Sequence, residues 1–133
     1  MDIEVTTKFI FQLMIGSFVT PIANAKDIPV ASYSQQVIFK NWILSRCLAK
    51  AYVSEEARND AQISASAYLE FGKAPIEMYE KADALVEQYL AKKYEGSVKG
   101  EFKTMKCIDL FHSKEVERLA KKAGSAATRK KTD

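Results

Sequence analysis

Apolar residues recur at every third or fourth position over most of this chain, which is the spacing of an amphipathic helix. No alternating apolar and polar stretch is long enough for a typical strand, and the three prolines leave long windows open for helices. The pattern therefore predicts an all-α fold, a single compact domain of about five helices. We expect these helices to cover approximately residues 34–53, 54–72, 75–95, 102–111 and 113–123.

The helix predicted at 34–53 carries apolar residues on two of its faces. Its first face consists of Val37, Leu44, Leu48 and Ala51, and its second face of Ile38, Trp42, Ala49 and Val53. A helix with two apolar faces needs neighbours on two sides to bury them. We therefore expect this helix to lie at the centre of the bundle.

Capping residues and glycines indicate where the helices begin and end. Ser54 and Ser113 are predicted N-caps, and the two glutamates after Ser54 would lie in the positive first turn of its helix. Pro75 suits the first turn of a helix, where its missing amide hydrogen costs no hydrogen bond. Gly96 and Gly100 interrupt the third helix and predict an exposed turn.

The first 25 residues have the pattern of a cleaved signal peptide. Lys8 precedes an apolar run from Phe9 to Val19, and Ala23-Asn24-Ala25 places small residues three and one positions before a cut at Lys26. A membrane-spanning helix would need roughly 20 predominantly apolar residues, whereas polar residues and a proline interrupt this run. We therefore expect the chain from Lys26 onward to be exported to an oxidising compartment, with no membrane contact after cleavage.

Charge and composition argue against nucleic-acid binding. The excess positive charge lies in residues 121–133, with five basic residues against one acid, whereas residues 26–120 hold 14 residues of each sign. A broad basic face for a phosphate backbone is therefore not expected. With 47% hydrophobic residues, the chain has enough apolar side chains for one core. We assign residues 26–123 to the helical domain and expect residues 124–133, which lack apolar anchors, to form a disordered, flexible basic tail.

Cys47 and Cys107 are the only cysteines, and they lie on two different predicted helices. Export to an oxidising compartment favours a disulfide between them, and two buried thiols acting as small apolar side chains are the alternative. A Cys-His hydrolase would pair Cys107 with His112, the single histidine, but these two residues point about 140° apart on a continuous helix. We therefore expect no catalytic set and predict that the chain is not an enzyme.

Metal and cofactor sites are not expected either. Two cysteines and one histidine cannot complete a closed zinc site, and no carboxylate run has the spacing of a calcium loop. Gly96 and Gly100 are not followed by the Gly-Lys-Ser/Thr ending of a phosphate-binding loop. A binding protein is the function that this profile favours.

Several segments resemble one family of immunity proteins. They are Trp42, Cys47–Tyr52, Ala67–Phe71, Lys92–Tyr94, Gly96–Val98, Gly100–Phe102 and Thr104–Glu115, within a match over about residues 39–119. In these segments the chain is similar to the periplasmic immunity proteins for type VI secretion amidase effectors of the fourth family. The block that starts at Thr104 is the longest and the most specific.

This resemblance implies an α-helical, homodimeric periplasmic protein without a cofactor, which neutralises a peptidoglycan-cleaving amidase toxin. In the family a dimer binds two toxin molecules, and one helix and one protruding loop occupy the toxin's active-site cleft. For this chain we expect the loop after the third helix and the acidic face of that helix to make these contacts, because the loop is exposed and flanked by glycines. The predicted contact residues are Glu77, Glu80, Tyr94, Glu95, Gly96, Ser97, Val98 and Lys99.

Two functions from other classes stay open at this point. A hydrolase would require a convergent nucleophile and base, which a fold with Cys47 and Cys107 bonded could not provide. A general periplasmic adaptor or chaperone that binds many clients would need a large exposed apolar groove. The loop could also be a simple connection between helices, with Tyr94 covering the core and Ser97 only solvated.

Overall fold

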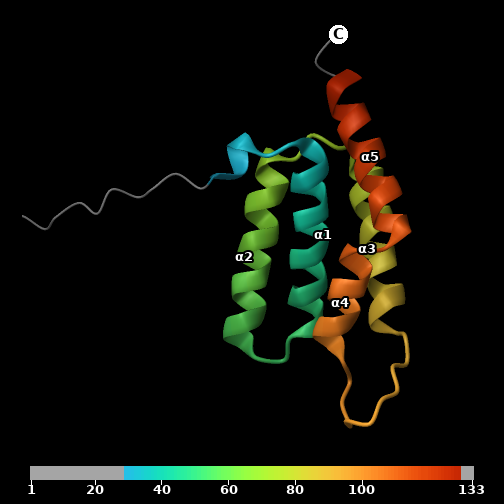
Figure 1. Ribbon diagram of the computed structural model, residues 1–133. Coiled ribbons are helices and arrows are strands. Elements are labelled where there is room, and N and C mark those ends of the chain that lie inside the picture. The colour runs from blue at the N-terminus through green and yellow to red at the C-terminus, as the bar shows by residue number, and fades with distance from the viewer. Residues whose placement is uncertain (1–28, 130–133) are drawn as a thin grey trace, which may run out of the picture.

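The structure is a computed structural model, and it describes residues 29–129. These residues form a bundle of helices with a long loop at one end (Figure 1), so the predicted all-α fold is confirmed. The elements are the 3-10 helix η1 (Pro29–Ser32), α1 (Gln35–Ala51), α2 (Glu55–Phe71), α3 (Ile76–Leu90), α4 (Lys103–Phe111) and α5 (Lys114–Arg129). The predicted signal peptide and its cleavage site at Lys26 lie outside the described residues. None of the helices within 29–129 is long and apolar enough to cross a membrane.

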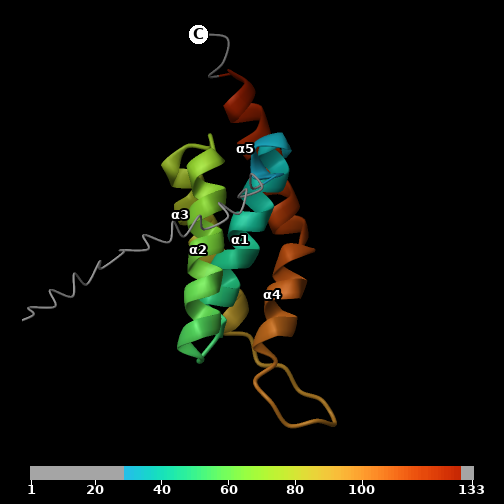
Figure 2. The same ribbon diagram turned by 90° about the vertical axis from the view of Figure 1, so that its left-hand side faces the viewer.

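The central position predicted for the first helix is confirmed. α1 packs against α2, α3, α4 and α5, and Figure 2 shows it with α2 on one side and α4 on the other. Its buried side is broader than the two predicted faces, because Phe39 and Ile43 are buried as well. Val37 and Val53, which we expected to be buried, are 41% and 83% exposed. Val53 follows the end of α1, and Val37 lies in its first turn next to the N-cap Ser34, so neither side chain reaches the core.

The predicted caps of α2 and α5 differ in how they work. Ser113 accepts a hydrogen bond from the backbone amide of Val116 at 3.2 Å, as an N-cap does. Ser54 precedes α2 as predicted, but its hydroxyl makes no capping hydrogen bond. The other end of α2 is held by Gln35 of α1, whose side chain donates to the carbonyl of Phe71 at 3.0 Å. The start of α1 is thereby tied to the end of α2.

An aromatic cluster joins α1 to α3 in the core. The centroid of the Tyr79 ring lies 5.2 Å from the centroid of the Phe39 ring and 4.8 Å from that of the Trp42 ring. These pairs have the tilted and edge-on arrangements that aromatic rings prefer. The hydroxyl of Tyr79 reaches the backbone at Gly72, where no side chain stands in its way. Burial raises the pKa of this phenol, and its oxygen has no hydrogen-bond partner of normal geometry within residues 29–129. The close approach at Gly72 lets α3 pack against the end of α2.

The structure corrects the expected start of the basic tail. Residues 124–129 continue α5 instead of forming a disordered segment, and of the predicted tail only residues 130–133 lie outside the description. Ala123 and Ala127 are buried, and Gly124 packs closely against the side chain of Gln36 on α1. The sequence argument looked for large apolar anchors, whereas small residues let α5 approach α1 closely.

Candidate partner-binding site

The segment between α3 and α4 projects beyond the end of the bundle (Figures 1 and 2). Residues 95–100, which include the predicted contacts Glu95, Gly96, Ser97, Val98 and Lys99, are all exposed. Val98 is 70% exposed, although removing an apolar side chain from water lowers the free energy. The tip of this loop therefore presents an apolar group and polar neighbours to whatever approaches that end of the molecule.

Tyr94 lies at the base of the loop rather than at its tip. It is half-buried, and its hydroxyl donates a hydrogen bond of 2.6 Å to a carboxylate oxygen of Asp109 on α4. This hydrogen bond raises the pKa of Tyr94 to about 12, because the phenol must stay protonated to donate it. Tyr94 thus joins the loop to α4. This position agrees better with the alternative in which Tyr94 belongs to a simple connection between helices than with a residue that contacts the partner directly.

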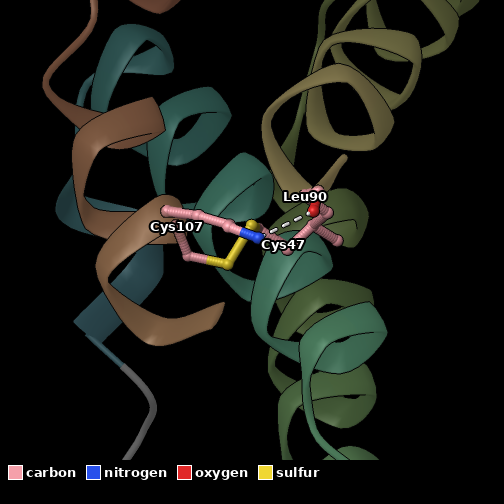
Figure 3. The surroundings of a disulfide bond; sticks show 4 residues. Cys47, Leu90 and Cys107 are labelled. Carbon is pink, nitrogen blue, oxygen red and sulfur yellow. Dashed lines mark hydrogen bonds between the residues drawn. A yellow bond between two sulfur atoms is a disulfide. The ribbon is translucent and has the colours of Figure 1, made fainter. Parts of the chain in front are cut away.

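Lys106 was not among the predicted site residues, yet its side chain ends at the base of the same loop. It is 7% exposed, and its ammonium donates a hydrogen bond of 3.1 Å to the carbonyl oxygen of Leu90 at the end of α3. Figure 3 shows this bond beside the disulfide of Cys47 and Cys107. A lysine in an amphipathic helix is ordinarily solvated, so the sequence carries no signal that marks this one as buried.

The disulfide predicted from export is present between Cys47 of α1 and Cys107 of α4, with 5.6 Å between their Cα atoms. Both residues are fully buried, so the alternative of two free buried thiols is excluded. The bond also leaves Cys107 without a thiol that His112 could activate. Within residues 29–129 no three His, Cys, Asp or Glu side chains come together to hold a metal ion.

The left-handed backbone conformation in this segment is not at a glycine. Gly96 and Gly100 lie in an exposed turn, as predicted, but no glycine within the described residues has a positive φ. Phe102, the residue before α4, adopts the left-handed conformation instead, with φ of 52°. Its ring lies near Gly96, where an added Cβ would meet the ring at 3.6 Å. Phe102 thus turns the chain into α4, and its ring lies beside Gly96 of the loop.

Glu77 and Glu80 are exposed on α3, as predicted, but they do not adjoin the loop. They lie in the first half of α3, and the loop begins after its last residue, Leu90. At 1.5 Å per residue, about 15 Å of helix separates Glu80 from Leu90. The predicted contact residues therefore form two separate patches, which one partner can touch together only by lying along α3.

A groove between α2 and α3 runs beside the acidic face of α3. Its lining includes Trp42 from α1, and Glu80 and Asp83 from α3. Asp83 pairs with Arg46 at 3.0 Å and with Lys50 at 3.3 Å. Burial alone would raise the pKa of Asp83, but hydrogen bonds and charges from Arg46 and Lys50 outweigh it and lower the pKa below its ordinary value. Asp83 therefore ties α3 to α1, and Glu80 is the acid here with no ion pair among the described residues.

Comparison with known proteins gives consistent matches. The chain matches the family described as type VI secretion system amidase immunity protein, Tai4, over residues 37–120. It is similar to a structure of the effector–immunity system Tae4/Tai4 from Salmonella typhimurium, with 44% identity, a TM-score of 0.68, and coverage of 72% of this chain and 95% of that chain. For a Tae4–Tai4 complex from Enterobacter cloacae the identity is 34%, the TM-score 0.62, and the coverage 71% and 98%. For a structure from work on type VI-secreted toxins and self-resistance proteins in Serratia marcescens these values are 31%, 0.60, 81% and 85%. None of the curated proteins compared with the chain matches it.

Proposed function

Because this chain belongs to the family of type VI secretion system amidase immunity proteins, we propose that it inhibits its amidase effector by filling the effector's active-site cleft with the α3–α4 loop. It is an immunity protein that binds an amidase effector. The match over residues 37–120, which include α3, the loop and α4, is the observation that carries this function. We therefore propose that the protein has one dedicated effector as its partner, and not the many clients of a general adaptor.

The loop has the physical properties required of a segment that fills a cleft. Its tip is exposed and carries Val98, whose burial in a cleft would remove apolar surface from water. Its base is held to the bundle on two sides, by Tyr94 and by Lys106. A loop that keeps its shape before binding loses less conformational entropy on binding.

Inhibition of this kind requires no chemistry from the immunity protein, and we infer that the chain is not an enzyme. The two sulfur atoms of Cys47 and Cys107 are bonded to each other, so neither can act as a nucleophile. An inhibitor needs only to exclude substrate and water from the catalytic residues of the effector. Steric occlusion by the exposed residues 95–99 would be sufficient.

We propose that Glu77 and Glu80 form a second contact with the effector. Both carboxylates are exposed, and neither has an ion pair among the described residues. They would meet basic groups beside the cleft, which would favour association in the right orientation. The distance of this patch from the loop implies that the effector covers most of the length of α3.

Replacing Ser97, Val98 and Lys99 by three glycines should weaken effector binding by at least about tenfold, or roughly 1.4 kcal/mol. The substitution removes the side chains of the tip and leaves the contacts at the base of the loop intact. Isothermal titration calorimetry with the purified cognate effector measures the affinity. Circular dichroism should show an unchanged helical signal and nearly the same melting temperature.

Val53 offers a matched control for this experiment. It lies in the loop between α1 and α2, at the same end of the bundle in Figure 1, and it is 83% exposed. Val53→Gly should leave the affinity for the effector at the wild-type value. Wild-type affinity in the triple-glycine variant would show that the inhibitory surface lies elsewhere, with α2 around Arg58, Asn59 and Gln62 as the next candidate.

We propose further that the mature protein is a periplasmic homodimer that begins at Lys26 and binds two effector molecules. Large apolar side chains on the surface support a second copy as partner, since Ile63 is 69% and Ile76 is 64% exposed. Light scattering of the protein purified from the periplasm at micromolar concentration should give twice the mass that mass spectrometry finds for residues 26–133. The monomer mass in solution would exclude the dimer, and a chain that retains residues 1–25 would exclude cleavage.

A further inference from the structure

A buried lysine holds the base of the α3–α4 loop. The side chain of Lys106 is in the interior of the protein, with 7% of the residue exposed, and within residues 29–129 its ammonium has no carboxylate within ion-pair distance. Lysine is almost never buried in this way unless a partner compensates its charge. The partners that Lys106 has must therefore explain why a charged residue occupies this position.

Two groups at the start of the loop face the ammonium of Lys106. The carbonyl oxygen of Leu90 accepts its hydrogen bond at 3.1 Å, and the ring of Tyr94 lies with its centroid 5.6 Å away. Leu90 is the last residue of α3, where carbonyl groups lack helical partners and the helix dipole is negative. A cation is favoured there, and the face of an aromatic ring adds to the attraction.

The backbone that carries Lys106 is itself fixed to the core. Cys107 is the next residue, and its bond to Cys47 anchors this turn of α4 to α1 (Figure 3). The ammonium is therefore held at a defined position relative to the bundle. Through it, the end of α3 and the first residues of the loop are placed as well.

Tyr94 is held from a second side, by Asp109 on the same helix. Asp109 follows Lys106 by three residues, so the two side chains lie on neighbouring positions of one face of α4. The aromatic ring of Tyr94 interacts with the lysine, and its hydroxyl donates to the aspartate at 2.6 Å. The residues from Leu90 to Tyr94 thus have a fixed course, and the tip starts from a fixed point.

A lysine is not required at this position for stability alone. An apolar side chain of similar length would fill the same space without the cost of burying a charge. A methionine could not, however, hold the carbonyl of Leu90 or attract the ring of Tyr94. The directional contacts are what the lysine adds.

We propose that Lys106 is a positioning residue for inhibition, which holds the α3–α4 loop in the conformation that enters the effector's cleft. This proposal rests on the proposed function, because it takes the loop as the inhibitory element. Lys106 does not need to touch the effector. It acts by reducing the conformational freedom that the loop would otherwise lose on binding.

The test compares Lys106→Met with Lys106→Arg and with Lys114→Met, a control in which an exposed lysine of α5 is changed. Hydrogen exchange of the amides of Ala91 and Lys92, which donate to the carbonyls of Glu87 and Tyr89 at 3.0 and 3.2 Å, reports opening at the base of the loop without effector. We expect exchange in Lys106→Met to be on the order of tenfold faster at these two amides and unchanged in the buried part of α1, with effector affinity lower by a similar factor. The arginine variant should recover most of both losses, and the Lys114 control should behave as wild type.

The affinity of a combined variant separates positioning from general stability. If Lys106 acts through the tip, adding Lys106→Met to the triple-glycine variant should cost no further affinity, because the tip contacts are already lost. A second full loss of affinity would overturn the proposal. Wild-type exchange of the Ala91 and Lys92 amides in Lys106→Met would also overturn it, whether or not the loop is the inhibitory element.

The experiment distinguishes failure of this proposal from failure of the proposed function. Wild-type affinity in the triple-glycine variant would show that the loop does not fill the effector's cleft. The exchange rates test the role of Lys106 independently of that result. If Lys106→Met does not fold, Tyr94→Phe removes the hydroxyl bonded to Asp109 at a half-buried site. Faster exchange and weaker binding in that variant would support a loop held at its base, and wild-type values for both would overturn it.

Discussion

Replacing both Cys47 and Cys107 by alanine is expected to lower the free energy of unfolding by about 4 kcal/mol. The disulfide joins residues 60 positions apart, near the end of α1 and within α4. Without it, the unfolded chain regains the freedom that the closed segment lacks. This loss is a large share of the stability of a domain of this size, which is on the order of 5–15 kcal/mol. Urea unfolding of the variant and of the oxidised wild type, followed by circular dichroism, measures the difference.

Reduction of the wild-type protein is the control for this prediction, because it breaks the bond without removing the sulfur atoms from the core. The reduced protein should lose nearly as much stability as the double-alanine variant, and reductant should leave that variant unchanged. A difference below about 1 kcal/mol between oxidised and reduced protein would contradict the loop-closure argument.

Gly72→Ala is expected to destabilise the protein by about 2–3 kcal/mol. A Cβ at this position would overlap the hydroxyl of Tyr79, and the backbone of Gly72 and the aromatic cluster leave little room for the ring to move. The φ angle of Gly72 is −75°, which alanine adopts without strain. The expected loss therefore comes mainly from this overlap, with a smaller part from the carbonyl oxygens of Tyr68 and Leu69, each 3.3 Å from the added Cβ. Thermal or urea unfolding checks it.

Tyr79→Phe provides the second half of a double-mutant cycle. The hydroxyl of Tyr79 makes no hydrogen bond of normal geometry among the described residues, so its removal alone should cost little. In the Tyr79→Phe background, Gly72→Ala should lose most of its destabilising effect. Gly100→Ala is the matched control, because an added Cβ there meets no atom within 4 Å. Equal losses for Gly72→Ala in both backgrounds would rule out the hydroxyl as the cause.

The sequence was sufficient to predict the helices that carry large apolar side chains. The period of three and four residues located α1 to α4, and the two apolar faces of α1 predicted its central place because both faces needed cover. The extension of α5 was missed because Ala123, Gly124 and Ala127 pack by being small, and small residues look the same in a tail as in a close helix contact. Exposure of Val37 was missed for a related reason, since periodicity does not tell how far the neighbouring helices reach.

The candidate site could be predicted only in part. The position and exposure of the loop followed from Gly96, Gly100 and the polar residues between them. The residues that hold the loop did not, because Lys106 and Asp109 read as solvated positions of an amphipathic helix until α3 is placed beside α4. The left-handed conformation of Phe102 was also not predictable, because an aromatic residue rarely adopts it and nothing local favours it there.

The separation between the tip of the loop and its base has a consequence for how such a protein can diverge. Residues 97–100 are exposed, and the anchoring hydrogen bonds lie outside them, at Tyr94 and Lys106. Substitutions at the tip therefore cost the fold little, whereas each one alters the surface offered to an effector. A lineage that meets a new amidase variant can change its recognition by successive replacements at a few positions, while selection for a folded domain acts on the rest of the chain.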